Sequence, residues 1–202
     1  MPKLETLKLE DVCFRKVTLN SELTPSIEDL YMQNIPDGCQ LTVVLPELRS
    51  FSMHYYGPLD DCTWINNMLK TATKLESFDS YKLRVGPTLD FAGNNLKYIR
   101  LHRAELLENI SVYAPRLQEL NLQACYGLDG ELCIVDSHPD HKAVPGRPSA
   151  FFVNTTNACI SPSIARVLST NPRVMHDDDS GGDSGNPMEA MFAGMHGGMG
   201  FY

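Results

Sequence analysis

The sequence predicts an α/β fold, a solenoid of stacked repeats with a parallel β-sheet on its concave face. The first observation behind this prediction is a phrase of the form L-x-x-L-x-L, which occurs six times at intervals of 21 to 27 residues. The second is that residues 95–104 and 116–125 share one pattern of apolar and polar positions. Self-similarity of this period is typical of solenoids, because each unit buries its apolar face only against its neighbours. We therefore expect one repeat domain over residues 1–175, with about seven repeats.

Each phrase is expected to form one strand. The apolar triplets are Leu4, Leu7 and Leu9; Ile27, Leu30 and Met32; Leu48, Phe51 and Met53; Leu75, Phe78 and Ser80; Leu96, Ile99 and Leu101; and Leu117, Leu120 and Leu122, with serine once in the last place. Side chains alternate along a strand, so the later two members of each triplet should point into the core. The residues between them should then lie on the concave face.

The segments that return from one strand to the next should form a convex side of extended chain and short helices. Residues 41–45 and 110–114 alternate apolar and polar positions and precede a proline, which indicates extended segments. The longest repeat has a different return segment. Its apolar residues fall at the spacing of one helix face and are Trp64, Ile65, Met68 and Leu69. Asp60 or Asp61 could cap this helix, and Ser161 before Pro162 predicts a second short helix.

After residue 125 the repeats become irregular. Residues 126–150 hold one apolar run, at 132–135, and then a loop rich in Pro and Gly. The repeat pattern returns at residues 151–156, whereas residues 171–174 look like the start of a repeat that we expect not to form. Residues 176–202 are acidic and then rich in Gly and Met, without apolar periodicity, which predicts a disordered tail.

Charge and composition exclude several classes of protein. The chain of 202 residues has a formal net charge of -8 and a pI near 5.2, which argues against binding nucleic-acid phosphates. No apolar run approaches the roughly 20 residues that span a bilayer, so we expect no membrane partner. The six cysteines form no C-x-x-C pair and are expected to be buried, reduced thiols of a cytoplasmic or nuclear protein.

The sequence carries no recognisable catalytic or metal-binding motif. A nucleophile elbow and a glycine-rich phosphate loop are both missing, so we expect no enzyme activity and no cofactor. Two sets of metal-ligand types lie close in sequence: Cys125, Cys133, His138 and His141, and the run from His176 to Asp179, which is expected to be a solvated charge run. The spacing of the Cys and His set lacks the close ligand pairs of zinc sites, so we expect no metal.

The candidate functional site is the concave face. Because neighbouring strands lie about 4.8 Å apart, equivalent positions of successive repeats should form columns across this face. The candidate partner-binding residues in these columns are Tyr31, His54, Tyr55, Asp79, Tyr81, Arg100, His102, Arg103 and Asn121. Tyr and Arg are enriched at binding hot spots, which favours a protein partner. The alternative is a solvated face whose aromatic rings only fill the groove.

A second ligand class fits part of the same set. Arg100, His102 and Arg103 carry the charge and the hydrogen-bond donors that bind phosphate. Their expected neighbour Asp79 argues against an open anion site.

Residues 2–125, and more loosely 126–174, resemble the leucine-rich-repeat superfamily. The cadence S-V-Y-A-P-R-L-Q-E-L of residues 111–120 is most similar to repeats of F-box type proteins. This resemblance implies a curved solenoid that captures a client for ubiquitin ligation, with ubiquitin-ligase adaptors as further partners if a longer form exists. No F-box segment precedes the repeats in this sequence.

The sequence also departs from the family at the turn after each strand. The asparagine expected there is replaced by Val12, Ile35, Tyr56, Leu83, Ala104 and Cys125. Such asparagines satisfy buried backbone groups, so their loss predicts irregular, wider turns. The predicted function is a non-enzymatic protein-interaction module, either the recognition part of a ubiquitin-ligase receptor or a scaffold or regulatory repeat protein outside ubiquitin chemistry. A phosphate or small-ligand sensor is the third alternative.

Overall fold

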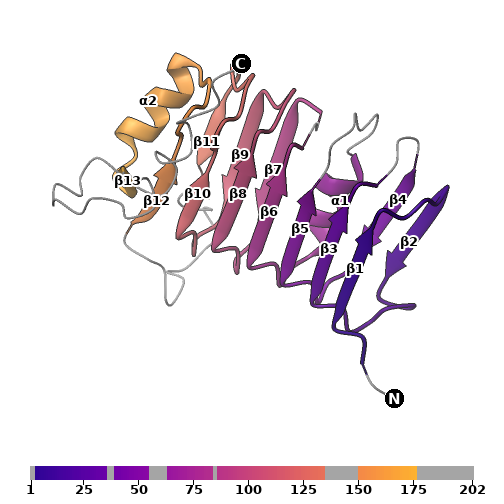
Figure 1. The fold of residues 1–202 in the computed structure, drawn as a ribbon. Coiled ribbons are helices and arrows are strands. Elements are labelled where there is room, and N and C mark those ends of the chain that lie inside the picture. The colour runs from indigo at the N-terminus through magenta and orange to yellow at the C-terminus, as the bar shows by residue number, and fades with distance from the viewer. Residues whose placement is uncertain (1–2, 36–38, 55–62, 84–85, 135–149, 177–202) are drawn as a thin grey trace, which may run out of the picture.

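The computed structural model describes residues 3–35, 39–54, 63–83, 86–134 and 150–176. These residues form an α/β protein in which the strands of all three sheets run parallel (Figure 1). The main sheet consists, in spatial order, of β1 (Thr6–Glu10), β3 (Asp29–Gln33), β5 (Ser50–His54), β6 (Ser77–Tyr81), β8 (Tyr98–His102), β10 (Glu119–Asn121), β12 (Phe151–Asn154) and β13 (Val174–His176). The prediction of an α/β fold with a parallel sheet is confirmed.

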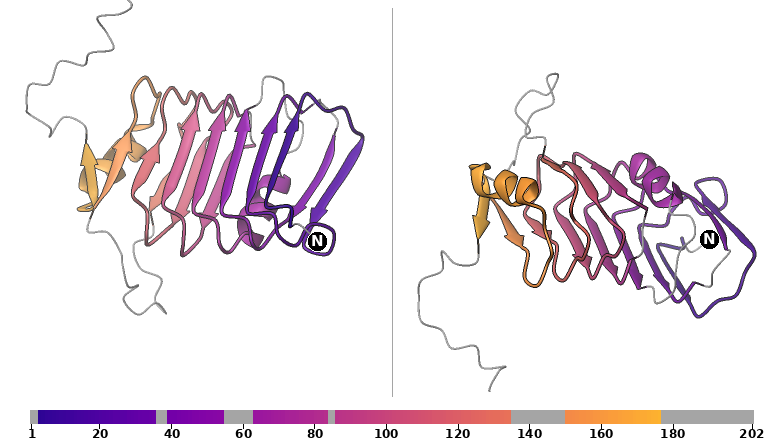
Figure 2. Two further views of the ribbon diagram at one scale, coloured as in Figure 1. Left: turned by 60° about the horizontal axis from the view of Figure 1, so that its bottom comes forward. Right: turned by 90° about the horizontal axis from the view of Figure 1, so that it is seen from above.

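A second layer covers one face of the main sheet (Figure 2). Its elements are the pair β2 (Lys16–Asn20) and β4 (Gln40–Val44), helix α1 (Thr63–Thr71), the strands β7 (Thr88–Ala92), β9 (Asn109–Tyr113) and β11 (Leu132–Ile134), and helix α2 (Pro162–Thr170). Helix α1 packs against both β4 and β7, and α2 packs against β11. The chain thus passes back and forth between the two layers, and the predicted mixture of extended segments and short helices is found in the second one.

The apolar triplets set the register of the main sheet. Leu7, Leu30, Phe51, Phe78, Ile99, Leu120 and Val153 are aligned across seven neighbouring strands. From Leu30 onward these side chains are buried, and they face the second layer. A slip of one residue would turn the whole column to solvent, so burial fixes the pairing. The first repeat lies at the sheet edge, and there Leu4 remains 52% exposed.

Aromatic rings join the two layers where α1 replaces a strand. Phe51 packs against Trp64 of α1 and against Phe78, with ring centroids 6.1 and 5.3 Å apart. Phe78 in turn meets Phe91 of β7 edge to face at 5.1 Å. Phe51, Phe78 and Phe91 are almost completely buried, so this aromatic cluster belongs to the core between the two layers.

Both predicted helices form. The buried face of α1 consists of the four predicted residues, whereas the proposed caps Asp60 and Asp61 lie outside the described residues. Helix α2 begins as predicted, because the Ser161 hydroxyl accepts a hydrogen bond from Ile164 N at 3.2 Å and Pro162 occupies the first turn.

The turns after the main strands are regular, so the predicted irregular, wider turns are wrong at the described positions. Each of these turns contains a residue with φ between 50° and 58° at the equivalent place in its repeat: Asp11, Asn34, Lys82, Arg103, Ala124 and Asn157. From Asp11 to Ala124, the backbone N–H of this residue donates to a carbonyl of the next repeat at 2.8 to 3.1 Å. Backbone hydrogen bonds between successive repeats therefore satisfy the turn, a role expected of asparagine side chains. The residue after each positive-φ position is where asparagine was expected, and at Leu83 and Cys125 it is a buried apolar residue.

Two other predictions need correction. Residues 171–174 do begin a further strand, because β13 pairs in parallel with β12 and extends through His176, one residue beyond the predicted domain boundary. The cysteines are mostly not buried, since Cys13, Cys133 and Cys159 are exposed and only Cys125 is fully buried among those described. The rest of the predicted tail, residues 177–202, lies outside the described residues.

The backbone at Gly130, just before β11, lies close to residues 108 and 109 at the start of β9. A Cβ atom at Gly130 would lie 2.2 Å from Asn109 Oδ1 and 2.9 Å from the Glu108 carbonyl oxygen. Asn109 Oδ1 already accepts a hydrogen bond from Glu131 N at 2.8 Å. Glycine is therefore required at 130, because any side chain would displace this amide.

Candidate functional site

The predicted columns lie on the open face of the main sheet, defined here as the face turned away from the second layer. The register aligns Tyr31 with Ser52, Asp79, Arg100 and Asn121 in one column, and Gln33 with His54, Tyr81 and His102 in the next. Arg103 follows β8 in the turn, and Tyr55 lies outside the described residues. The structure therefore brings eight of the nine predicted residues to the open face or its edge.

Three rings form a row across β3, β5 and β6. The centroids of Tyr31 and His54 are 5.4 Å apart in an edge-on arrangement, and those of His54 and Tyr81 are 6.0 Å apart. All three rings are half-buried. Lys8 Nζ lies 5.8 Å from the Tyr31 ring centroid, and the Tyr31 hydroxyl donates to Gln33 Oε1. The open face thus presents a continuous aromatic surface with a cation at its end.

Arg100 is engaged within the sheet. Its Nε and Nη2 atoms donate to the two carboxylate oxygens of Glu119 at 2.9 and 2.6 Å, and its guanidinium lies 5.1 Å from the Tyr98 ring. The hydrogen bond from Arg100 lowers the pKa of Glu119, and the same bond raises the pKa of Arg100. A bidentate pair of this kind is a strong charge-assisted interaction. It leaves Arg100 poorly placed for the phosphate that the sequence suggested.

Asn121 has a structural partner. Its Oδ1 accepts the backbone N–H of Gln123 at 3.0 Å, and Asn154 in the next repeat repeats this bond with Thr156 N at 2.9 Å. Asparagine favours such local turns because its side chain reaches the backbone two residues on. The predicted binding residue Asn121 thus shapes the turn that follows β10.

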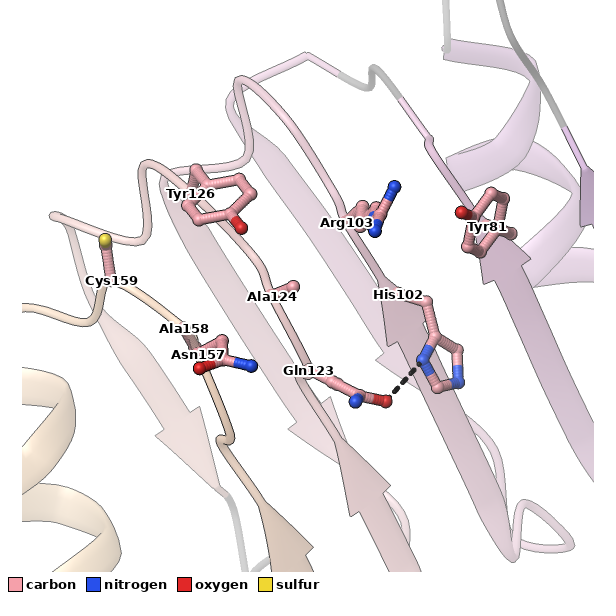
Figure 3. A pocket seen from close by; sticks show the side chains of 9 residues that line it. All are labelled: Tyr81, His102, Arg103, Gln123, Ala124, Tyr126, Asn157, Ala158 and Cys159. Atoms are coloured by element: carbon pink, nitrogen blue, oxygen red, sulfur yellow. Dashed lines mark hydrogen bonds between the residues drawn. The ribbon is translucent and has the colours of Figure 1, made fainter. Parts of the chain in front are cut away.

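A cleft of about 630 Å³ lies beyond the carboxyl ends of β6, β8, β10 and β12 (Figure 3). The residues that line it are Tyr81, His102, Arg103, Gln123, Ala124, Tyr126, Asn157, Ala158 and Cys159. Tyr81, His102 and Arg103 were predicted site residues. Tyr126 and the segment 157–159 were missed, because they come from parts of the chain where the repeat pattern is weak.

The cleft is electropositive at one wall. The Arg103 guanidinium lies 5.7 Å from the centroid of the Tyr81 ring, and Lys82 Nζ lies 5.9 Å from the same ring. His102 Nδ1 is 3.1 Å from Gln123 Oε1, within hydrogen-bond distance (Figure 3). None of the nine described lining residues is Asp or Glu. Arg103 is exposed, and no carboxylate among the described residues pairs with it.

The opposite edge of the main sheet differs in its electrostatics. Arg49 bridges Glu28 at 3.0 Å and Glu76 at 2.9 Å, and Lys97 reaches Glu76 at 2.6 Å. The hydrogen bond from Lys97 lowers the pKa of Glu76. Arg49 and Lys97 at this amino-terminal edge are thus paired with carboxylates, whereas Arg103 in the cleft has no ion pair with a described residue.

Two members of the conceivable zinc set, Cys125 and Cys133, are among the described residues. Cys125 is buried and its thiol donates to the Leu101 carbonyl oxygen at 3.2 Å, while Cys133 is exposed and His138 and His141 lie outside the described residues. Burial raises the pKa of Cys125 to about 11. Within the described segments, no three His, Cys, Asp or Glu residues are grouped closely enough to hold a metal ion.

Neither of the two helices in the described chain is long and apolar enough to cross a membrane. Comparison with protein-family models gave no match. Searches of the curated proteins and of the solved structures also gave none. Function therefore has to be inferred from the residues themselves.

Proposed function

We propose that this chain is a leucine-rich-repeat solenoid whose concave face, the open face of the main sheet, binds a protein partner. Support for the repeat architecture comes from the single main-sheet strand contributed by each phrase and from the aligned apolar column. The second layer contains more strands than helices, which departs from a helix-backed leucine-rich repeat. A strand-rich second layer matches the short β-branched return segments of this sequence.

The observation that carries the binding proposal is the row of rings Tyr31, His54 and Tyr81. Rings at these positions pack against one another on a face that no other element of the described chain covers. Tyr side chains supply large contact area at low entropic cost, and hot spots are rich in them. A face that served only solubility would not need adjacent aromatic residues on three successive strands.

The leading specific role is recognition of a client by a ubiquitin-ligase receptor in the cytoplasm or nucleus. The alternative is a scaffold or regulatory protein without that chemistry. Both roles are non-enzymatic and use the same face. Co-purification of cullin-ligase adaptors with the full-length native protein separates them, because only the receptor requires adaptors.

A mutational comparison tests the binding face. The partner is first captured from native extract and identified, and its affinity is then measured with purified chains. Tyr81→Ala should raise Kd by about 30-fold or more, the effect of losing a hot spot of 2 kcal/mol. Tyr113→Ala, on β9 in the second layer, is the matched control and should leave Kd within about twofold. If both variants are folded by circular dichroism and raise Kd equally, the proposed binding face is wrong.

A further inference from the structure

The cleft at the carboxyl edge of the main sheet has the chemistry of a site for a carboxylate. The one guanidinium among its described lining residues is that of Arg103, which is exposed and lies against the Tyr81 ring. Arg103 has no ion pair with a described residue. The next acidic residue along the chain, Glu105, does not line the cleft and has an interaction of its own. Lys82 is likewise engaged within the chain, which leaves the Arg103 guanidinium to face a ligand.

Three equivalent turns form the floor of the cleft beside Arg103 (Figure 3). The strand register continues into these turns, because Arg103 N donates to the Gln123 carbonyl oxygen at 3.0 Å and Ala124 N to that of Thr156 at 2.9 Å. Arg103, Ala124 and Asn157 therefore occupy the same place in neighbouring repeats, each about 4.8 Å from the next. The short side chain of Ala124 leaves room between the guanidinium and Asn157.

Neutral hydrogen-bond donors surround this space. The backbone N–H of Asn157 has no acceptor among the described residues, whereas the equivalent groups of Arg103 and Ala124 donate to the next repeat. The side chains of Asn157 and Tyr126 also line the cleft, and both residues are exposed. A guanidinium binds a carboxylate through paired hydrogen bonds. One guanidinium among neutral donors suits this singly charged group better than a phosphate monoester, which carries about two negative charges.

We propose that this cleft binds an acidic side chain of the protein partner, with its carboxylate on Arg103 and above Ala124. This inference rests on the proposed function, because Tyr81 belongs both to the row of rings and to the lining of the cleft. A partner that covers the row therefore reaches the cleft. Arg103 then selects partners that carry Asp or Glu at that place.

A peptide titration tests the cleft without the partner. The probe is the tetrapeptide Asp-Glu-Asp-Glu with both ends blocked, its neutral counterpart is Asn-Gln-Asn-Gln, and NMR follows the backbone amides of the isotope-labelled full chain. The acidic peptide should shift the signals of Ala124 and Asn157 saturably, with a Kd of about 1 mM or tighter. The neutral peptide should bind about tenfold more weakly, because it loses the charge-assisted hydrogen bonds. Equal affinities, or no saturable shift at the cleft, would overturn the proposal.

Two pairs of variants locate the contact. Arg103→Gln should raise the Kd of the acidic peptide about tenfold, whereas Arg166→Gln, which removes an exposed arginine of α2 in the second layer, should leave it within about twofold. Ala124→Asp places a carboxylate beside Arg103 and should weaken binding about fivefold or more relative to Ala124→Asn, which has the same size without the charge. Asp and Asn both tolerate the positive φ of this position. Equal Kd values within either pair would show that the peptide binds elsewhere and would refute the proposal.

The identified partner separates a failure of this inference from a failure of the proposed function. Tyr31→Ala removes the ring at the far end of the row from the cleft, so it should raise the Kd of the partner whether or not the cleft is used. Arg103→Gln should raise the same Kd about tenfold. A raised Kd in Tyr31→Ala with an unchanged Kd in Arg103→Gln would leave the binding face in place and refute the acidic contact. Unchanged Kd values in both variants would refute both proposals.

Discussion

The positive φ of Ala124, in the turn after β10, predicts the sign of the stability change when this residue is replaced by glycine. Ala124 has φ of 54°, a conformation that costs an L-residue with a Cβ roughly 1–2 kcal/mol and costs glycine nothing. Ala124→Gly removes this native-state penalty. The same change gives the unfolded chain more freedom, which destabilises the native state by about 0.4–1 kcal/mol. The net expectation is a gain of about 0.5–1 kcal/mol in the free energy of unfolding.

Ala92→Gly is the matched control. Ala92 ends strand β7, is exposed, and is not among the residues with positive φ, so its substitution changes the unfolded state equally without relieving strain. It should lower the free energy of unfolding by about 0.5–1 kcal/mol. The difference between the two variants isolates the cost of the left-handed conformation and should be about 1–2 kcal/mol.

Urea denaturation followed by circular dichroism measures both values. In thermal unfolding of a domain of this size, the two Tm values should differ by about 2–8 °C, with Ala124→Gly the higher. If Ala124→Gly were as destabilising as Ala92→Gly, residue 124 would not be left-handed, and the regular turns described here would be refuted.

Three further perturbations test other parts of the structure. Gly130→Ala should lower the free energy of unfolding by about 1–3 kcal/mol, because the new Cβ collides with backbone and with a side-chain amide. Gly86→Ala is the control, because Gly86 has open space around it, and this change should be neutral or slightly stabilising. Equal urea midpoints for the two variants would contradict this reasoning. Arg100 lowers the pKa of Glu119 in the folded chain, so the stability that this pair contributes is fully present above the ordinary glutamate pKa near 4.5 and is lost as the pH falls through the lowered one. Glu119→Gln should therefore flatten the loss of stability on acidification in a pH series of urea titrations, and an unchanged slope would argue against the pair. Because burial raises the pKa of Cys125 to about 11, this thiol should resist maleimide at pH 8 until the chain unfolds, and early labelling detected by mass spectrometry would contradict its burial. The exposed thiols that should react first are Cys13, Cys133 and Cys159.

Much of the main sheet could be predicted because burial and sequence spacing agree there. Leu30 and Phe51 fall at the same place in successive phrases, and the structure aligns them in one buried column. The helix around Trp64 could also be predicted, because its apolar face has helical spacing and its repeat is longer than the others. In both cases a local pattern determines which side chains are removed from water.

The turns and the cleft could not be predicted in the same way. The positive φ of Arg103 and Ala124 could not be predicted from residue type, because neither is glycine or asparagine. The backbone hydrogen bonds that support these turns come from the next repeat, which a local sequence pattern does not show. Tyr126 and Cys159 belong to segments without a clear repeat phrase, and they meet Arg103 only after the strands are stacked. Likewise, β13 is specified by its pairing with β12 and carries no full phrase of its own.

Side-chain footprinting of the complex with its identified partner tests the central claim most directly. Hydroxyl radicals modify exposed tyrosine and histidine side chains, and mass spectrometry gives the rate at each residue with and without the partner. If the open face is the binding surface, Tyr31, His54 and Tyr81 should be protected about fivefold or more, while Tyr113 in the second layer should keep its rate. Protection of Tyr113 with unchanged rates at the three-ring row would place the partner on the other layer and contradict the account.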